Sequence, residues 1–594
     1  MSDSQPPGPL TPRSQCRCPW NRLLDHRWLL AALVLAAILE AVLIVRSPVI
    51  SRDGVTFIRF ARMLPSGVSA ALHQQDQHPG YPAMILAARQ LLPADADDNA
   101  TDQWILAARL TTAVCGVLVV AVVWGITRQL FADPAADIAA IVAATLPILR
   151  QNSADALSDT PHLLLWLTAC LLSCPALRQW RLGWFAAAGL ASGLAYWVRP
   201  EGLSVAIVLC LVTPLAAWRT GGASFLRMAT CAATAAVVAL ATIAPYSLLS
   251  SKLLTSKQAP MARPEPVLPY VAHKALVESE RVASQLPMSN ASTPAAGSAN
   301  STAKLSTHVG VIVHTLGEAI SELAREVFKA LRVVYIPVFL LGCYYVGRHR
   351  PPLGPFLIVN ALGMWHAALL LYVFFISGYI SHRHVLPIVV LAIPACAVGL
   401  TNLGVWISAR LSMPPRRGVF AAVLVCALIM TPWTLRQVNY SYNHLLVAAQ
   451  WLDAHAAPGA VVVSNTSLVP FYAHRAETCT DGSAPTVDEA IRPDVAQRCD
   501  YVVVDQLIEY FNPDWEAQLA ANYLVVKRIA PDHGGPNSTA MTIYQSRYSG
   551  HELNGIPGEA PLTRDSTGDA SAVHTAARSP AAGEAPAATA SASL

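Results

Sequence analysis

Residues 28–59 read WLLAALVLAAILEAVLIVRSPVISRDGVTFIR and join an apolar part to a polar part. The apolar part, residues 28–46, is long enough to cross a bilayer as a helix, and the polar part places Asp53 a few residues beyond the lipid boundary. The apolar part is too long for a removable signal peptide and lacks a small-residue cleavage site, so we predict a permanent anchor. Four arginines precede it, Arg13, Arg17, Arg22 and Arg27. The positive-inside bias therefore predicts that residues 1–27 are cytoplasmic.

Ten more apolar runs follow, which predicts an α-helical multi-span membrane protein with about eleven transmembrane helices. They cover residues 104–126, 134–149, 159–175, 183–198, 202–217, 226–249, 329–347, 353–377, 384–403 and 418–434. Of the 594 residues, 54% are hydrophobic and 13% are charged, which excludes a soluble enzyme because soluble chains carry about twice that charged fraction. The net charge of +4 is not gathered into a basic face, so we expect no nucleic-acid partner.

Alternating crossings put the arginines of the short turns on the cytoplasmic side and three long polar stretches on the outer side. The turn arginines are Arg128, Arg178, Arg181, Arg219, Arg348, Arg350, Arg410, Arg416 and Arg417. The polar stretches are residues 47–103, residues 250–325 and everything after 435. The preference for arginine over lysine and the high alanine content indicate a bacterial protein. We therefore expect a multi-pass protein of the cytoplasmic (inner) membrane, with residues 28–435 as its multi-span domain.

After residue 435 the long apolar runs end, and a helix pattern followed by short strand patterns takes their place. An amphipathic helix that ends near Pro458 is followed by the apolar strand VVVS, and CDYVVVDQ, NYLVVKRI and MTIYQ suggest further strands. This alternation predicts a small extracytoplasmic α/β domain, residues 436–546. Residues 547–594 are predicted to be a disordered tail, because they are rich in Gly, Ala, Ser, Pro and Thr. Cys479 and Cys499 are the cysteines of this domain, and an oxidising compartment favours a disulfide between them.

Two carboxylates lie close to the predicted outer lipid boundary. Asp53 follows the first helix, and Asp159, in ALSDTPHLLLW, stands at the outer end of the fourth. Taken alone, Asp159 also suits a helix cap and Asp53 a solvated loop acid. The turn from His78 to Pro82, HPGYP, offers the imidazole of His78 and the phenol of Tyr81 near the same surface.

Two cationic motifs occupy the same predicted side. In WVRPEG, Arg199 and Glu201 lie between two predicted helices that are short for spanning a membrane. A guanidinium at the depth of the lipid phosphates can bind a phosphate with two donors. An interfacial arginine that only extends its charge into water is the alternative. In GYISHRHVLP, Arg383 and His384 lie in a turn on the predicted outer side. Because the positive-inside bias disfavours cations on that side, a cation cluster there indicates an anion nearby.

Glu40 is the clear acid at membrane depth. It is expected to pair with a neighbour across the bundle, with His366 or Arg109 as the candidate partner. The spacing of cysteine and histidine matches no zinc motif, so no metal site and no cofactor are assigned.

These motifs, in this order, resemble those of the family-39 glycosyltransferases and their relatives, the protein O-mannosyltransferases and the lipid A aminoarabinose transferase, which share the C-type glycosyltransferase (GT-C) fold. The resemblance covers roughly residues 28–435 and rests on Asp53, HPGYP, SDTP, RPEG and SHRHVLP. Two features depart from the family. Its early acid is frequently written Asp-Glu, whereas Gly54 follows here, and HPGYP loses one proline of the family's His-Pro-Pro-Leu-Tyr pattern and shifts the aromatic residue.

The resemblance implies transfer of a sugar from a polyprenyl-phosphate donor, held at the membrane lipid, to an extracytoplasmic glycan, lipid or protein acceptor. Asp53 is then the candidate general base, because a carboxylate within reach of an acceptor hydroxyl can take its proton. Asp159 is the second catalytic candidate and orients sugar hydroxyls or the acceptor. The expected substrate-binding residues are His78, Tyr81, Arg199, Glu201, Arg383 and His384, with the two arginines stabilising the leaving phosphate.

Other functions stay open at this point. A multi-span lipid or solute transporter or flippase also carries intramembrane polar groups, although it normally shows internal repeats and helices broken at mid-membrane. A non-catalytic membrane scaffold predicts that Asp53 is dispensable. Within the enzyme class, oligosaccharide ligases and polymerases are a nearer alternative.

Overall fold

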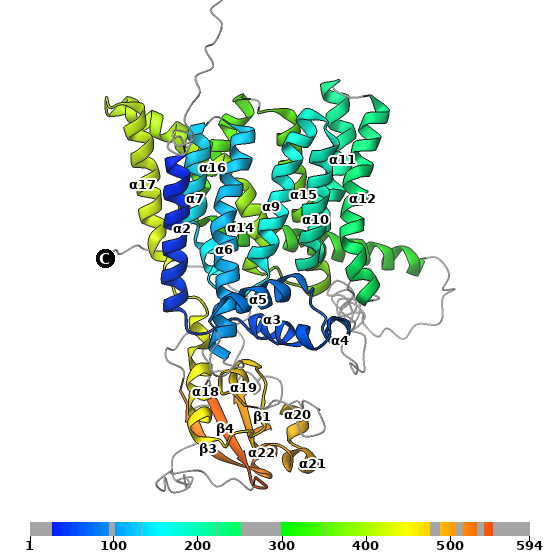
Figure 1. The fold of residues 1–594 in the computed structure, drawn as a ribbon, viewed down its shortest axis with the longest axis vertical. Coiled ribbons are helices and arrows are strands. Elements are labelled where there is room, and N and C mark those ends of the chain that lie inside the picture. Colours follow the sequence, from blue (N-terminus) through cyan, green and yellow to red (C-terminus); the bar gives the residue numbers. More distant parts are fainter. Residues whose placement is uncertain are drawn as a thin grey trace, which may run out of the picture.

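The computed structural model describes residues 26–93, 101–131, 133–221, 224–250, 299–349, 351–475, 487–505, 515–530 and 540–549. Three parts follow one another along its long axis (Figure 1). A bundle of long helices forms the largest part. A layer of short helices crosses one end of this bundle, and a small α/β domain lies beyond that layer.

The bundle has a helix at each of the eleven predicted crossings. They are α2 (Arg27–Arg46), α6 (Thr101–Leu130), α7 (Asp133–Thr145), α9 (Asp159–Gln179), α10 (Leu182–Val198), α11 (Ser204–Thr220), α12 (Phe225–Ser250), α14 (Ala299–His349), α15 (Leu353–Ser377), α16 (Leu386–Arg410) and α17 (Pro415–Thr434). Within the described residues, nine helices are long and apolar enough to span, and α7 and α10 are shorter apolar helices. After a break at Leu146, α8 (Pro147–Ser153) continues α7. The predicted multi-span helical fold is confirmed.

Small residues allow the spanning helices to approach at backbone distance. A Cβ atom added to Gly342 of α14 would lie 1.8 Å from the carbonyl oxygen of Ala395 in α16. One added to Gly189 of α10 would lie 2.4 Å from the carbonyl oxygen of Ala235 in α12. In lipid, where helices gain little from leaving water, such close van der Waals packing helps to hold them together.

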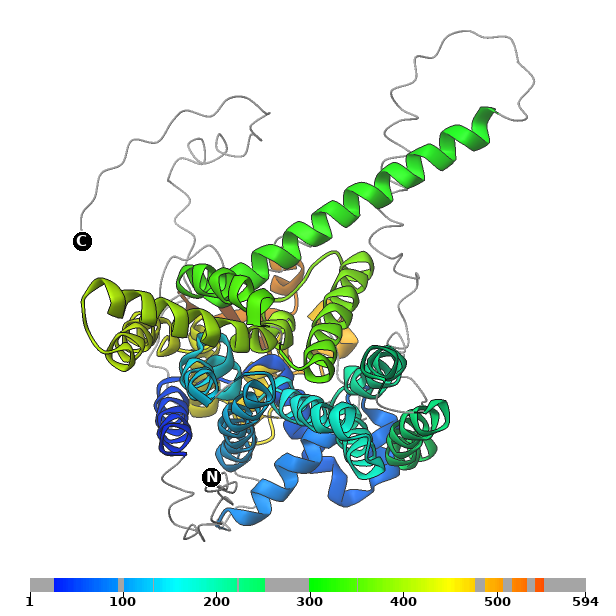
Figure 2. The same ribbon diagram turned by 90° about the horizontal axis from the view of Figure 1, so that it is seen from above.

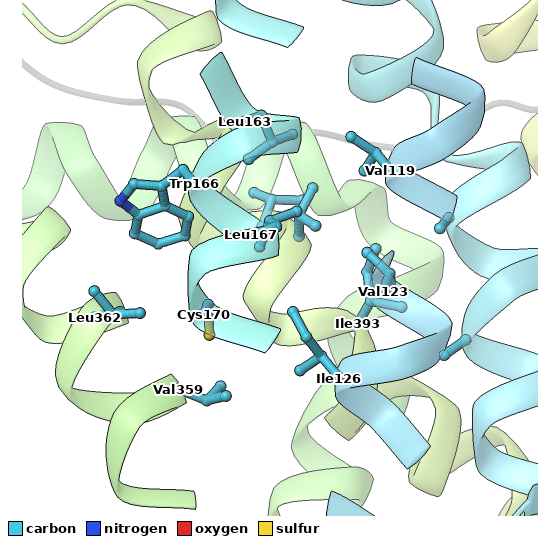
Figure 3. Packing of buried hydrophobic residues seen from close by; sticks show 14 of the residues in the cluster. Val119, Val123, Ile126, Leu163, Trp166, Leu167, Cys170, Val359, Leu362 and Ile393 are labelled. Carbon is cyan, nitrogen blue, oxygen red and sulfur yellow. The ribbon is translucent and has the colours of Figure 1, made fainter. Parts of the chain in front are cut away.

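Larger apolar side chains fill the centre of the bundle, where α6, α9, α15 and α16 meet (Figure 3). Trp166 of α9 is fully buried, and its indole N–H donates a hydrogen bond to Ser204 Oγ at 2.9 Å, so its polar atom is satisfied inside the bundle. Figure 3 labels Val119, Val123, Ile126, Leu163, Trp166, Leu167, Cys170, Val359, Leu362 and Ile393.

Glu40 pairs with Arg150 of α8, and the prediction of His366 or Arg109 as its partner was wrong. Arg150 Nη1 lies 2.7 Å from Glu40 Oε1, and Arg150 Nη2 donates to the carbonyl oxygen of Gly116 at 2.9 Å. Both side chains are buried, at 0% and 2% exposure. The break at Leu146 explains the pairing, because it lets α8 turn its arginine into the space between α2 and α6.

The layer across the end of the bundle consists of α3 (Arg52–Met63), η1 (Leu64–Ser66), α4 (Val68–Gln74) and α5 (Gly80–Leu91). Ser51 caps α3, since its hydroxyl accepts a hydrogen bond from Gly54 N, and Asp53 therefore lies in the first turn. One face of α3, with Val55 and Ile58, is buried against both the bundle and the α/β domain. The layer lies between the two larger parts (Figure 1), and Asp53, in the first turn of α3, is part of it.

A sharp bend divides α14. Arg332 has φ 58° and ψ 164°, a backbone conformation that interrupts the helix. The part before this bend runs outwards from the bundle in Figure 2, although Ala319 and Ala330 still pack against its core, and residues 313–348 together form the candidate span. Three short 3-10 helices accompany the bundle: η2 (Pro200–Leu203), η3 (His382–Val385) and η4 (Tyr440–Tyr442).

The C-terminal domain packs helices on a four-stranded sheet. Its elements are α18 (Asn443–His455), β1 (Val462–Ser464), α19 (Leu468–Tyr472), α20 (Val487–Ala490), α21 (Pro493–Ala496), β2 (Tyr501–Asp505), α22 (Trp515–Ala520), β3 (Tyr523–Ile529) and β4 (Met541–Ser546). The strand order is β1-β2-β4-β3, with β1 and β2 parallel and the other pairs antiparallel. The small α/β domain is as predicted. Cys479 lies outside the described residues, so its disulfide with Cys499 stays a prediction.

The described parts of the three polar stretches all lie at one end of the bundle. The layer α3 to α5, the ends of α9 and α10 that carry Asp159 and Arg199, and the C-terminal domain share this end (Figure 1). The turn arginines among the described residues, from Arg128 to Arg417, fall at the opposite end. The predicted separation of the polar stretches and the turn arginines onto opposite sides is therefore consistent with the structure. Which end of the bundle faces outward stays a prediction.

Candidate active site

A cavity opens at the end of the bundle that faces α3. It is lined by the first turns of α9 and α16, by η2 and η3, and by the second half of α15. It encloses about 520 Å³ when the space open to solvent at its mouth is included. The lining residues are Asp159, His162, Leu163, Arg199, Glu201, His366, Leu369, Leu370, Val373, Arg383, His384, Leu386 and Pro387. Five predicted site residues, Asp159, Arg199, Glu201, Arg383 and His384, are therefore brought together here.

Arg199 is placed by the RPEG turn. Because Pro200 disfavours a helical conformation in the residue before it, α10 ends at Val198 and Arg199 is extended, with φ −153° and ψ 146°. Gly202 completes the turn, since a Cβ atom there would lie 2.2 Å from the backbone carbon of Ala195. The sequence RPEG thus folds back on α10 and turns the guanidinium towards the first residue of α9.

The guanidinium of Arg199 is paired with two carboxylates. It binds Asp159, whose side chain is 6% exposed, and its Nε lies 3.9 Å from Glu201 Oε2. Burial disfavours the charge of Arg199, but these carboxylates outweigh it and hold its pKa above the ordinary value. Arg199 is therefore a permanent cation in the wall of the cavity.

Asp53 reaches the cavity through Arg383. Arg383 Nη1 lies 2.6 Å from Asp53 Oδ2, and the Asp53 side chain is 46% exposed, so it is open to an approaching molecule. Arg383 belongs to η3, where Ser381 N donates to His384 Nδ1 at 3.3 Å. The carbonyl oxygen of His384 in turn accepts from His366 Nε2 at 3.0 Å. These bonds fix η3 against α15 and hold Arg383 between Asp53 and the cavity.

His78 and Tyr81 do not line the cavity. His78 is buried, with its ring centroid 5.1 Å from that of Tyr196 and 5.1 Å from that of Tyr246. The hydroxyl of Tyr81 donates to the carbonyl oxygen of Ala108 at 3.1 Å, and burial raises the pKa of Tyr81 above its ordinary value. The HPGYP turn packs against the end of α10 instead, so these two residues support the wall that carries Arg199.

Sequence reasoning missed two histidines of the cavity. His162 lies three residues after Asp159 and therefore on the same face of α9, one turn further into the bundle. That spacing was a usable signal. His366 stands in the middle of the apolar helix α15, and nothing in its local sequence indicates that it meets η3.

A third missed residue, Asp155, holds the segment that precedes Asp53. Asp155 Oδ1 accepts hydrogen bonds from Ser51 N at 3.0 Å and Ala156 N at 2.8 Å, and its Oδ2 accepts from Asn439 Nδ2 at 2.9 Å. Asn439 Nδ2 also donates to the carbonyl oxygen of Val49 at 3.2 Å. The carboxylate is buried in the loop between α8 and α9.

The C-terminal domain binds the segment before Asp53 through Tyr472, the last residue of α19. Ile50 N donates to the Tyr472 hydroxyl at 2.9 Å, and that hydroxyl donates to the carbonyl oxygen of Pro48 at 3.3 Å. Burial raises the pKa of Tyr472 to about 12, so the hydroxyl keeps the proton that it donates. We call Asp155, Asn439 and Tyr472 the clamp. The clamp holds residues 48–51 in place through hydrogen bonds to their backbone. Because Asp53 follows two residues after Ser51, the clamp sets its position.

Among the residues that the structure describes, no group of three or more His, Cys, Asp or Glu side chains is arranged to hold a metal ion. The polar groups of the cavity are two arginines, two carboxylates and three histidines. This set can bind an anion at the arginines and hydrogen-bond a polar molecule beside it, with the Asp53 carboxylate next to both.

Comparisons with known proteins bear on the family and on the fold. Residues 100–248 match the family model of the dolichyl-phosphate-mannose-protein mannosyltransferases. No curated protein matches the sequence. Among solved structures, ArnT from Cupriavidus metallidurans in the apo state is similar with a TM-score of 0.51 and 14% identity, over 88% of this chain and 98% of that one. The same protein bound to undecaprenyl phosphate gives 0.51 and 14%, over 89% and 98%.

The family match includes Asp159, Arg199 and Glu201, and the similarity to ArnT extends over both the bundle and the C-terminal domain. The resemblance that was drawn from the motifs is confirmed: this chain has the GT-C fold and resembles the family-39 membrane glycosyltransferases.

Proposed function

We propose that the protein transfers a sugar from a polyprenyl-phosphate donor to an acceptor outside the cytoplasmic membrane. The observation that carries the proposal is the placement of Arg199 and Arg383 in one cavity at the end of the spanning helices, with Asp53 paired to Arg383. A prenyl chain stays in hydrocarbon while its phosphate reaches the lipid boundary, and the predicted spans put these cations at that boundary. The structure of ArnT with undecaprenyl phosphate supports the same class of donor.

The transfer needs a base and a charge-stabilising site. The Asp53 carboxylate takes the proton of an acceptor hydroxyl as its oxygen forms a bond to the anomeric carbon. The bond between that carbon and the phosphate oxygen breaks, and the phosphate leaves with the electron pair. Negative charge that grows on the leaving oxygen is stabilised by Arg199 and Arg383. Asp159 keeps Arg199 in place, so its role is to position that cation beside the reacting bond.

Arg383 links the two halves of this reaction. Without substrate it neutralises Asp53, and an incoming phosphate competes for the same guanidinium. Binding of the donor therefore releases the Asp53 carboxylate towards the acceptor. The acceptor is a glycan, a lipid or a protein on the outer side, where the half-exposed Asp53 is accessible.

The proposal is tested with purified full-length protein and undecaprenyl phosphate. Native mass spectrometry should show the lipid retained by the wild type and by Asp53→Asn, because this substitution nearly preserves shape. In proteoliposomes supplied with undecaprenyl-phosphate sugars and a cell-envelope extract, Asp53→Asn should lose about 100- to 10,000-fold in transfer rate, the usual contribution of a general base. Arg410→Lys, at the opposite end of the bundle, is the matched control. Failure of the wild type to retain the lipid, or full transfer by Asp53→Asn, would refute the proposal.

A further inference from the structure

The cavity contains two polar groups that the proposed chemistry leaves unused. His162 is 4% exposed, and its Nε2 atom is buried and has no hydrogen-bond partner within the described chain. Glu201 Oε2 is also buried without a hydrogen bond among the described residues, since Arg199 Nε lies 3.9 Å away. Both residues line the cavity. Most buried polar atoms in native proteins are hydrogen-bonded, so two unsatisfied atoms in one cavity indicate a polar ligand.

The neighbours of these two groups are already engaged. Arg199 pairs with Asp159, Arg383 pairs with Asp53, and His366 Nε2 donates to the carbonyl oxygen of His384. The unmet hydrogen-bonding capacity is therefore concentrated at His162 and Glu201. His162 lies one helical turn further into the bundle than Asp159, so this capacity begins where the phosphate-binding cations end.

We propose that His162 and Glu201 form the subsite that recognises the sugar of the donor. The inference rests on the proposed function. The Glu201 carboxylate accepts hydrogen bonds from ring hydroxyls, and a neutral imidazole Nε2 either donates to a hydroxyl or accepts from one. Leu369, Leu370 and Leu386 supply the apolar wall for the C–H face of the ring. Arg199 and Arg383 then bind the phosphate, and His162 and Glu201 bind the sugar attached to it.

This division predicts how the binding energy is distributed. A polyprenyl phosphate without sugar should contact the arginines and leave His162 unsatisfied. A sugar-loaded lipid should bind more tightly, because its hydroxyls satisfy the buried groups. A site built to hydrogen-bond a substrate hydroxyl discriminates strongly against a ligand that lacks it, because the buried groups are then left unpaired.

The test compares two lipids on the full-length protein in detergent. Undecaprenyl phosphate and a panel of undecaprenyl-phosphate hexoses are titrated, and affinity is read from the shift in Tm. We expect at least one sugar-loaded lipid to bind the wild type about tenfold more tightly than the bare lipid, and His162→Leu to abolish this difference while it leaves affinity for the bare lipid unchanged. His444→Leu, which replaces a buried histidine of α18 outside the cavity, should keep the difference.

A conservative variant guards against misfolding. His162→Gln keeps a hydrogen-bonding amide and should recover part of the preference for the sugar-loaded lipid, which a merely structural defect would not show. If the wild type binds bare and sugar-loaded lipids equally, or if His162→Leu weakens the bare lipid as much as the loaded one, the subsite is refuted while phosphate binding stands. If no polyprenyl phosphate stabilises the wild type, the proposed function fails and this inference fails with it.

Discussion

Replacing Tyr472 by phenylalanine should slow sugar transfer without weakening donor binding. The substitution removes one hydroxyl and keeps the ring, so the packing of α19 against the layer of short helices is preserved. It leaves Ile50 N without its 2.9 Å acceptor and frees the carbonyl oxygen of Pro48. Asp53 lies three residues after Ile50, so the change acts on the base through the backbone that carries it, while Arg199 is untouched.

The magnitude follows from the contacts. Ile50 is fully buried, and a buried amide that loses its acceptor costs about 1–3 kcal/mol. The other two clamp residues keep their bonds, so the segment should shift rather than unfold. A displacement of a catalytic group by about 1 Å can cost on the order of 100-fold in rate. We therefore expect kcat to fall about 10- to 100-fold, with KM for the donor lipid unchanged.

The assay needs a control for ordinary loss of stability. Tyr523 is also a buried tyrosine of the C-terminal domain, and its hydroxyl donates to the carbonyl oxygen of Ala490 at 3.0 Å. Tyr523→Phe removes an equivalent hydroxyl but does not touch residues 47–53. Both variants should lower the Tm by similar amounts, and only Tyr472→Phe should lower kcat. Equal kcat values in the two variants would refute the reasoning that the C-terminal domain positions Asp53.

Three further outcomes are expected. Glu40→Gln leaves the guanidinium of Arg150 buried without its counter-charge and should lower the free energy of unfolding by about 3–5 kcal/mol. The double variant Glu40→Leu/Arg150→Met should recover most of that loss in thermal unfolding. A double variant as unstable as Glu40→Gln would contradict this. Arg199→Lys should lower the affinity for undecaprenyl phosphate about tenfold in a Tm titration, because a compact ammonium cannot reproduce the planar pair of donors with which a guanidinium binds a phosphate, and wild-type affinity would exclude Arg199 from the site. Reporter fusions after Arg181 and after Ser441 should give cytoplasmic and external signals respectively, and the reverse result would move the cavity to the cytoplasmic face.

The spanning helices and the wall of the cavity could be predicted because their signals are local. A backbone in lipid must satisfy its hydrogen bonds internally, so a run of apolar residues has little choice but to form a helix. The motifs SDTP, RPEG and SHRHVLP then mark the ends of three such helices. Once charge fixes the side of each end, Asp159, Arg199 and Arg383 are placed at one face, and helix packing brings them into one cavity.

The contacts that complete the site could not be predicted, since they join residues far apart in the chain. Ile50 and Tyr472 are separated by 422 positions, and Asp155 and Asn439 by 284. No periodicity or composition links such positions. The partner of Glu40 was not predicted for a different reason. Arg150 follows the end of an apolar run in which the helix breaks at Leu146, and hydropathy alone does not show that the turn after this break directs its arginine into the bundle.

The distribution of charge favours catalysis at one surface over transport through the bundle. A transporter places ionisable groups near mid-membrane, where each must be reached in turn from both sides. Glu40 and Arg150 are at membrane depth, but they are buried against each other and against the backbone of Gly116, which makes them a structural tie between helices. The accessible charges instead surround a cavity that opens beside Asp53. Because the C-terminal domain holds the segment that carries Asp53, it is coupled to this end of the bundle, as the proposed transfer from a bound lipid to an outer acceptor requires.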